Sequence, residues 1–104
     1  MRRMNASQLA AHLQTAEPLM IDVREPWEFD ICHIEGSINI PMGQIAQAVE
    51  GIDSTGETVV ICHHGIRSQQ VIQYLRQHDI KNLINLDGGV DAWARDVDPS
   101  MPVY

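Results

Sequence analysis

Cysteine and long hydrophobic segments are both scarce in this sequence. Two cysteines among 104 residues are too few for a disulfide framework. No apolar segment follows the charged first residues, and no run is long enough to span a membrane, so we expect neither a signal peptide nor a transmembrane helix. These absences predict a reduced cytoplasmic protein with free thiols and no membrane partner.

Basic residues are scarce as well. Seven lysines and arginines stand against fourteen aspartates and glutamates, which gives a net charge of -7. Binding to nucleic acid or to an anionic membrane surface needs a basic face, so neither is expected as a partner. The chain also lacks repeats, low-complexity segments and a sustained heptad pattern, and we therefore expect a single domain over residues 1–104 that is a monomer.

Hydrophobic residues make up 44% of the chain, enough for a packed core. Apolar runs typical of strands alternate with helical patterns, which predicts an α/β fold with a mainly parallel sheet. The expected strands cover residues 19–23, 38–40, 58–61 and 83–86. The expected helices cover residues 6–13, 26–30, 45–49, 68–78 and 90–95, the first one capped by a capping box of Asn5 and Gln8.

The apolar run that ends at Ile61 leads into the most informative segment. Cys62 follows this run, and the next residues are His63, His64, Gly65, Ile66, Arg67 and Ser68. This layout predicts a thiol at the C-terminal end of a buried strand and at the N-terminus of a helix, where free N–H groups favour an anion. Cys62 is therefore expected to be a partly ionised, nucleophilic thiolate, with Arg67 adding a permanent positive charge.

Right-handed crossovers would bring the loops after Val23, Ile61 and Leu86 to one edge of the sheet. Two charged residues, Asp22 and Arg24, flank Val23 at the start of the first of these loops. Asp22 could be a catalytic acid, although a buttress that accepts loop N–H groups is the preferred interpretation. Arg24 could bind substrate or pair with Glu25 or Glu28, and the sequence favours neither alternative.

Three segments carry a family resemblance. They are the loop Cys62-His63-His64-Gly65-Ile66-Arg67-Ser68, the N-terminal stretch Asp22-Val23-Arg24-Glu25 with Trp27-Glu28-Phe29 and His33-Ile34-Glu35-Gly36-Ser37-Ile38-Asn39-Ile40-Pro41, and the C-terminal stretch Leu86-Asp87-Gly88-Gly89-Val90-Asp91-Ala92-Trp93. In this order they resemble the signatures of a single-domain rhodanese, a sulfurtransferase. One departure is Cys32, which stands where the family usually has glycine; a positive φ there would imply strain.

The resemblance implies a rhodanese-like fold, with helices on both faces of the sheet, and a chemistry. Cys62 would take a sulfane sulfur from a small anionic donor such as thiosulfate and hold it as a persulfide, and a thiol or cyanide would then remove it. The loop from His63 to Ser68 would cradle the sulfur with its N–H groups, Gly65 permitting the turn. Arg67 would bind the donor or favour the thiolate, and protonated His63 or His64 would add to this effect. No cofactor is expected.

Two other functions stay open beside this one. A rhodanese-like module could bind a protein partner, or receive its sulfur from one and pass it on, with little small-molecule turnover. A cysteine-dependent phosphatase or arsenate-type reductase is disfavoured, because four residues separate Cys62 from Arg67 whereas phosphatases use five. No metal site is expected, since adjacent His63 and His64 should point in different directions. Cys32 is expected to be a buried apolar residue rather than a resolving thiol.

Overall fold

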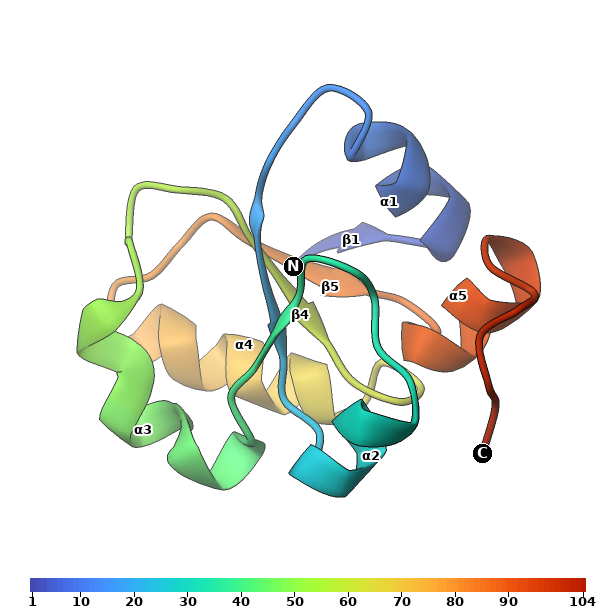
Figure 1. Ribbon diagram of the computed structural model, residues 1–104. Coiled ribbons are helices and arrows are strands. Elements are labelled where there is room, and N and C mark those ends of the chain that lie inside the picture. The colour runs from blue at the N-terminus through green and yellow to red at the C-terminus, as the bar shows by residue number, and fades with distance from the viewer.

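A five-stranded parallel sheet forms the centre of the protein (Figure 1). The computed structural model describes residues 1–104. The strands are β1 (Arg2–Met4), β2 (Leu19–Asp22), β3 (Ile38–Asn39), β4 (Thr58–Ile61) and β5 (Leu83–Leu86), in the spatial order β1-β5-β4-β2-β3. The helices are α1 (Ala6–His12), α2 (Pro26–Ile31), α3 (Ile45–Ala48), α4 (Arg67–Gln77) and α5 (Gly89–Asp96), with 3-10 turns η1 (Met42–Gln44) and η2 (Val49–Gly51).

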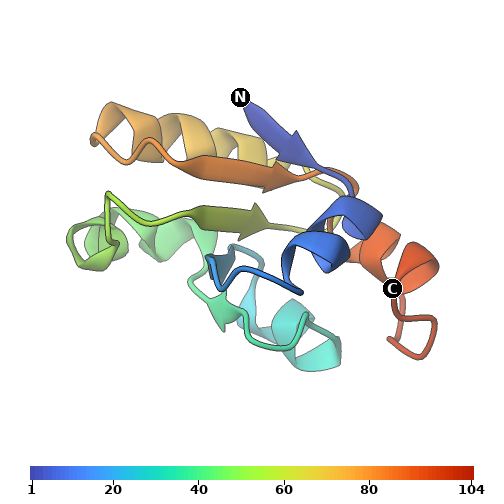
Figure 2. The same cartoon turned by 90° about the horizontal axis from the view of Figure 1, so that it is seen from above.

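Helices cover both faces of the sheet, as expected. One apolar cluster joins α1 and α5 to one face, and a second joins α3 and α4 to the other. The central strands β4 and β5 are buried along their whole length, because each face of a parallel sheet is covered by helices. Figure 2 shows these two strands side by side and running in the same direction.

The predicted α/β class is confirmed, and most predicted elements lie within two residues of the observed ones. The strands at 58–61 and 83–86 have the predicted bounds, because each is a short run that is apolar except for one residue, Thr58 and Asn85 respectively. The capping box is also present: the Asn5 side chain accepts the Gln8 N–H, and the Gln8 side chain accepts the Asn5 N–H, both at 2.8 Å. The helix predicted to begin at Ser68 begins one residue earlier, at Arg67.

Strand β1 was not predicted. It is a three-residue edge strand whose side chains are largely exposed, so it carries no hydrophobic pattern. Backbone pairing with β5 holds it in place, with Arg3 opposite Asn85. Its side chains add ion pairs from Arg2 to Glu57 and from Arg3 to Asp87, but these partners lie far along the chain and leave no local pattern in the sequence.

The parallel register brings the C-terminal ends of three strands together. Asp22 at the end of β2 pairs with Ile61 at the end of β4, and Val60 of β4 pairs with Asn85 of β5. The loops that follow these strands therefore meet at one edge, as the sequence predicted. None of the helices has both the length and the apolar character needed to cross a bilayer.

Candidate active site

Cys62 lies directly after β4, and its side chain is almost completely buried. The loop curls around the sulfur: the N–H of Gly65 donates a hydrogen bond to Sγ at 3.0 Å. Gly65 has a φ of +96°, and a Cβ there would lie 3.1 Å from Gly88 N and 3.2 Å from Leu86 O. Glycine is needed here both for the left-handed turn and for the close approach of the next loop. Of the loop N–H groups expected to cradle the sulfur, that of Gly65 donates to it.

Ser68 connects the sulfur to the neighbouring strand. The Cys62 thiol donates to Ser68 Oγ at 3.4 Å, and the Ser68 hydroxyl donates to Asn85 Oδ1 at 2.5 Å. Asn85 in turn donates to Asp87 at 2.7 Å and to the Gly65 carbonyl at 3.4 Å. Because a hydroxyl can rotate, Ser68 can also donate to a sulfur anion, which makes it adaptable to both states of the cysteine.

Helix α5 holds the loop from outside. The N–H of Val90 donates to Cys62 O at 2.9 Å, and the N–H of Asp91 donates to His63 O at 3.1 Å. Gly89 has a φ of +59°, and a Cβ at this position would overlap both of these carbonyl oxygens. The glycine therefore allows the helix to approach the loop closely enough to bind it.

Arg67 forms a two-pronged ion pair with Glu28 on α2. Its Nη1 and Nη2 atoms donate to the two carboxylate oxygens at 2.7 and 2.8 Å. Glu28 is almost fully buried, and the hydrogen bonds from Arg67 lower its pKa to about 2, with burial opposing the shift. The same carboxylate raises the pKa of Arg67, so both groups are charged over the physiological range. Arg67 thus supports the wall of the site.

Asp22 and Arg24 form a second ion pair beneath the first, and both side chains are fully buried. Arg24 Nε donates to Asp22 Oδ1 at 2.9 Å, and Arg24 Nη2 donates to Asp22 Oδ2 at 2.6 Å. Asp22 also accepts the backbone N–H of Arg24, so it is a buttress of the loop after β2. The alternative in which Arg24 pairs with the side chain of Glu25 or Glu28 is wrong. The turn after β2 folds Arg24 back onto Asp22, and Glu28 contributes only its backbone carbonyl oxygen to Arg24.

Tyr104 joins the two ion pairs. Its hydroxyl accepts a hydrogen bond from Arg24 Nη1 at 2.8 Å and donates one to Glu28 Oε2 at 2.7 Å. Burial raises the pKa of Tyr104 to about 12, although the hydrogen bond from Arg24 opposes this shift, so the phenol stays neutral. Its ring stacks on His63, with 4.1 Å between the ring centroids. The residue therefore closes one side of the site.

His63 and His64 lie on the same side of the loop. Their ring centroids are 3.9 Å apart, so the expectation that they point in different directions is wrong. Side chains alternate only along an extended strand, and the loop has already begun to curl at this point. Burial lowers the pKa of His63, and the neighbouring His64 lowers it further, so we expect His63 to be neutral rather than a positive charge beside Cys62. The remaining loop residue, Ile66, is exposed.

Cys32 needs no positive φ. Its φ is -163°, an extended conformation, so replacing glycine at this place causes no strain. The residue is buried in the apolar cluster beside α1 and α5, which agrees with its expected apolar role. Its carbonyl oxygen accepts a hydrogen bond from Arg24 at 2.7 Å.

Three residues of the site, Asn85, Asp91 and Tyr104, were not assigned a role from the sequence, and Glu28 was considered only as a partner of Arg24. Asn85 did leave a signal, because it is a polar residue within an otherwise apolar strand. Glu28 stood within the matching N-terminal stretch, but its partner Arg67 lies 39 positions further along the chain. Tyr104 follows two prolines in an irregular segment, where no periodic pattern could reveal it.

Comparisons with known proteins agree with this geometry. The family model of the rhodanese-like domain matches residues 5–96. An adenylyltransferase and sulfurtransferase, uba4 of Ogataea parapolymorpha, is 33% identical over 104 residues, covering 98% of this chain and 26% of the relative. The chain thus spans about a quarter of the length of the curated relatives it matches.

Solved structures share the fold over the whole chain. The rhodanese-like domain protein from Staphylococcus aureus has a TM-score of 0.85 at 26% identity, covering 100% of this chain and 99% of that one. The rhodanese-related protein from Thermoplasma volcanium has a TM-score of 0.82 at 30% identity, with 100% and 98% covered. The predicted rhodanese-like fold is therefore confirmed, and the chain belongs to the rhodanese-like domain family.

Proposed function

We propose that the protein is a sulfurtransferase that carries a sulfane sulfur as a persulfide on Cys62. The observation that carries this proposal is the surroundings of Sγ. The Gly65 N–H donates to it, and Ser68 contributes a hydroxyl that can donate as well. Hydrogen-bond donors fixed around one sulfur stabilise an anion at that atom, whether it is a thiolate or a persulfide.

The reaction proceeds in two displacements. The Cys62 thiolate attacks the outer sulfur of thiosulfate; a new S–S bond forms, the old S–S bond breaks, and sulfite leaves with the bonding electron pair. A thiolate or cyanide then attacks the terminal sulfur of the persulfide, which releases a new persulfide or thiocyanate and restores the Cys62 thiolate. The loop keeps the Gly65 N–H and the Ser68 hydroxyl beside the sulfur during both steps.

The relatives support sulfur transfer as the chemistry. Uba4 and its relative MOCS3 of Drosophila ananassae are each named as an adenylyltransferase and sulfurtransferase. We carry over only the second activity, because this chain matches a quarter of each relative and contains the cysteine loop.

A second function, sulfur relay from a protein or thiol persulfide, is favoured by one contact. Both outer nitrogens of Arg67 are engaged by Glu28, and the carboxylate neutralises the guanidinium charge. A small dianion such as thiosulfate therefore meets little free positive charge at this arginine. A persulfide donor depends less on that charge, because it carries at most one negative charge on sulfur. A cytoplasmic protein thiol is the acceptor proposed for this case.

The test is intact-mass measurement of the protein after treatment with thiosulfate or, separately, with glutathione persulfide. We expect the wild-type chain and Cys32→Ser to gain one sulfur atom that cyanide or a thiol removes, and Cys62→Ser to gain none. Loading by thiosulfate supports the first function, and loading by the persulfide alone supports relay. Sulfur uptake by Cys62→Ser, or by no variant with either donor, would overturn the proposal. Hydrolysis of an aryl phosphate that depends on Cys62 would indicate a phosphatase instead.

A further inference from the structure

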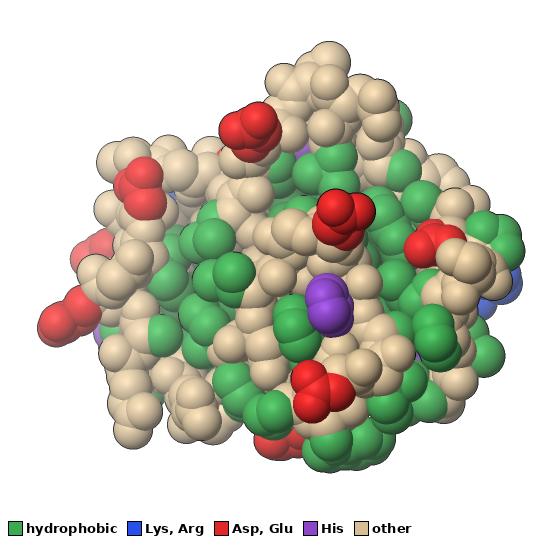
Figure 3. Space-filling model, viewed as in Figure 1, with side chains coloured by type: hydrophobic (Ala, Val, Ile, Leu, Met, Phe, Trp, Pro, Cys, Tyr) green, Lys and Arg blue, Asp and Glu red, His purple; other side chains and the backbone are tan.

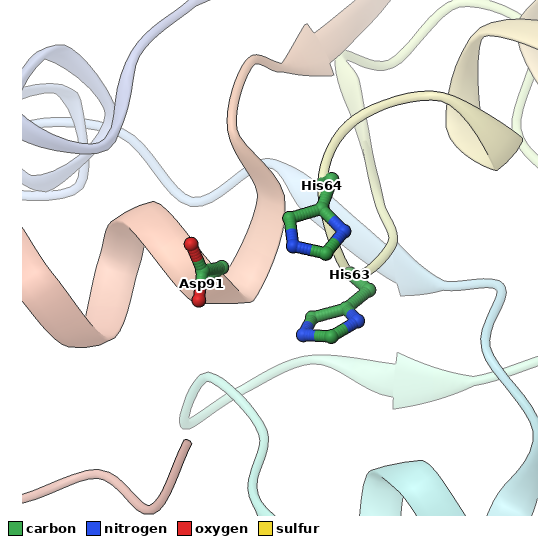
Figure 4. Close-up of side chains that lie close together, drawn as sticks. All are labelled: His63, His64 and Asp91. Carbon is green, nitrogen blue, oxygen red and sulfur yellow. The ribbon is translucent and has the colours of Figure 1, made fainter. Parts of the chain in front are cut away.

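Three side chains converge beside the cysteine loop without taking part in the sulfur cradle. His63 and His64 follow β4, and Asp91 belongs to the first turn of α5. One ligand atom from each lies within 4.8 Å of the other two. Figure 4 shows both imidazole rings and the carboxylate gathered around one space between the loop and the helix.

The two histidines differ from the other three of the chain. The ring nitrogens of His12, His33 and His78 each contact an oxygen: the Glu57 carboxylate, the Phe29 carbonyl and the Tyr74 carbonyl, respectively. No ring nitrogen of His63 or His64 has a hydrogen-bond partner within the protein. Their lone pairs therefore remain available to a ligand from outside.

The third side chain is available in the same way. One carboxylate oxygen of Asp91 contacts Arg95 at 3.3 Å, an ion pair at the exposed side of α5. The other oxygen accepts no hydrogen bond. The position of Asp91 relative to the loop is fixed by its own N–H, which donates to the His63 carbonyl at 3.1 Å. His63 is fixed in addition by its stack on Tyr104.

We propose that His63, His64 and Asp91 form a binding site for one divalent transition-metal ion, Zn²⁺ in particular. Two imidazoles and a carboxylate are the ligand set that such ions prefer, and three protein ligands leave one position of a tetrahedral ion open. Zinc bonds of about 2.0–2.1 Å require ligand atoms about 3.3 Å apart. The exposed His64 is free to make this movement, while His63 and Asp91 are already held in place.

A bound ion would join the loop after Cys62 to α5 by a second set of bonds, beside the two backbone hydrogen bonds. The open position would face solvent at the mouth of the site. Ion binding requires no sulfur on Cys62, so its test is independent of the proposed sulfur transfer.

The experiment is calorimetric titration of untagged protein with Zn²⁺, carried out in the Cys62→Ser background so that the thiol contributes no ligand. We expect one ion per chain. Asp91→Asn and His64→Gln should each weaken the affinity by about tenfold or more. The control is His78→Gln, whose ring already contacts a carbonyl and lies outside the cluster; it should leave the affinity unchanged.

Nuclear magnetic resonance of the histidine rings gives a second readout that needs no substitution in the cluster. We expect Zn²⁺ to shift the ring nitrogens of His63 and His64 and to leave those of His12, His33 and His78 unchanged. The proposal is overturned if Cys62→Ser abolishes binding, if Asp91→Asn and His64→Gln bind as well as their parent, or if the shifted rings are others.

Discussion

At the residue scale, the Glu28 carboxylate connects the cysteine loop to α2 and to Tyr104. It accepts two hydrogen bonds from Arg67, one from the Tyr104 hydroxyl and one from the Glu25 N–H. These contacts hold its pKa near 2, against an ordinary value of 4.5. Because the folded-state pKa is the lower one, the stability that Glu28 contributes is complete above pH 4.5 and is lost as the pH falls toward 2.

Replacing this carboxylate should change the response to acid. We expect Glu28→Gln to lower the free energy of unfolding by about 2 kcal/mol at neutral pH, since hydrogen bonds to a charged group are lost. Between pH 4.5 and 2 the variant should lose less stability than the parent, because the titrating group is gone. Urea unfolding at a series of pH values measures both effects. The control is Glu35→Gln at an exposed side chain, and equal acid sensitivity of Glu28→Gln and the parent would contradict the prediction.

The role of a residue could be predicted only where that role depends on residues nearby in the sequence. The position of Cys62 between a buried strand and a helix could be read from the sequence, as could the turn at Gly65. The partner of Arg67 could not, because ion pairing across 39 positions depends on how α2 packs against the loop. The partner of Arg24 was missed for a different reason: Asp22 is only two residues away, but a fully buried pair requires the turn after β2 to fold back.

At the element scale, the approach of α5 to the loop depends on Gly89. We expect Gly89→Ala to lower the free energy of unfolding by about 3 kcal/mol or more, because the new Cβ overlaps two carbonyl oxygens and the residue has a φ of +59°. Sulfur loading of Cys62 should fall in the same variant, since the loop is displaced.

The matched control is Gly43→Ala. Gly43 lies in η1, and a Cβ there would meet nothing within 4 Å. Chemical denaturation of both variants gives the comparison. Equal stability of the two variants would mean that α5 can move away from the loop without loss.

Helices and strands could be predicted where their side chains are buried, because burial leaves a hydrophobic pattern in the sequence. Strands β4 and β5 are buried and are apolar except for Thr58 and Asn85, and both were located to the residue. The edge strand β1 is short and largely exposed, so it has no hydrophobic pattern by which it could be predicted. The start of α1 was also predicted, because its capping box is formed by Asn5 and Gln8, which lie close together in the sequence.

At the scale of the whole molecule, Tyr104 connects the segment after α5 to β2 and α2. Tyr104→Phe keeps the ring that stacks on His63 and removes the hydroxyl that contacts Arg24 and Glu28. We expect a loss of about 1–3 kcal/mol, because both charged partners lose a hydrogen bond while remaining buried. Thermal and urea unfolding measure this loss.

The chain offers a matched control in Tyr74→Phe. The hydroxyl of Tyr74 makes no hydrogen bond within the protein, and its ring lies beside His78. This variant should unfold like the parent. If Tyr104→Phe also does so, the hydroxyl does not connect the two ion pairs in solution.

The net charge of -7 is a property of the whole surface rather than of the site. The face in Figure 3 shows separate acidic side chains and little lysine or arginine. Near Cys62, by contrast, the charged side chains are paired with each other: Arg67 with Glu28, and Arg24 with Asp22. Composition therefore predicts the character of the outer surface, but it does not reveal the balanced charges at this edge of the sheet.

The hydrogen bonds on the outer side of the cysteine loop have a consequence for the peptide dipoles within it. The carbonyls of Cys62 and His63 are taken by α5, and the carbonyl of Gly65 is taken by Gln69 and Asn85. The carbonyl oxygens of these three peptide groups are thus paired with donors from α4, α5 and β5. The N–H of Gly65, by contrast, is directed at the sulfur. The loop therefore presents the positive end of the Gly65 peptide dipole to the sulfur, even though the net charge of the protein is negative.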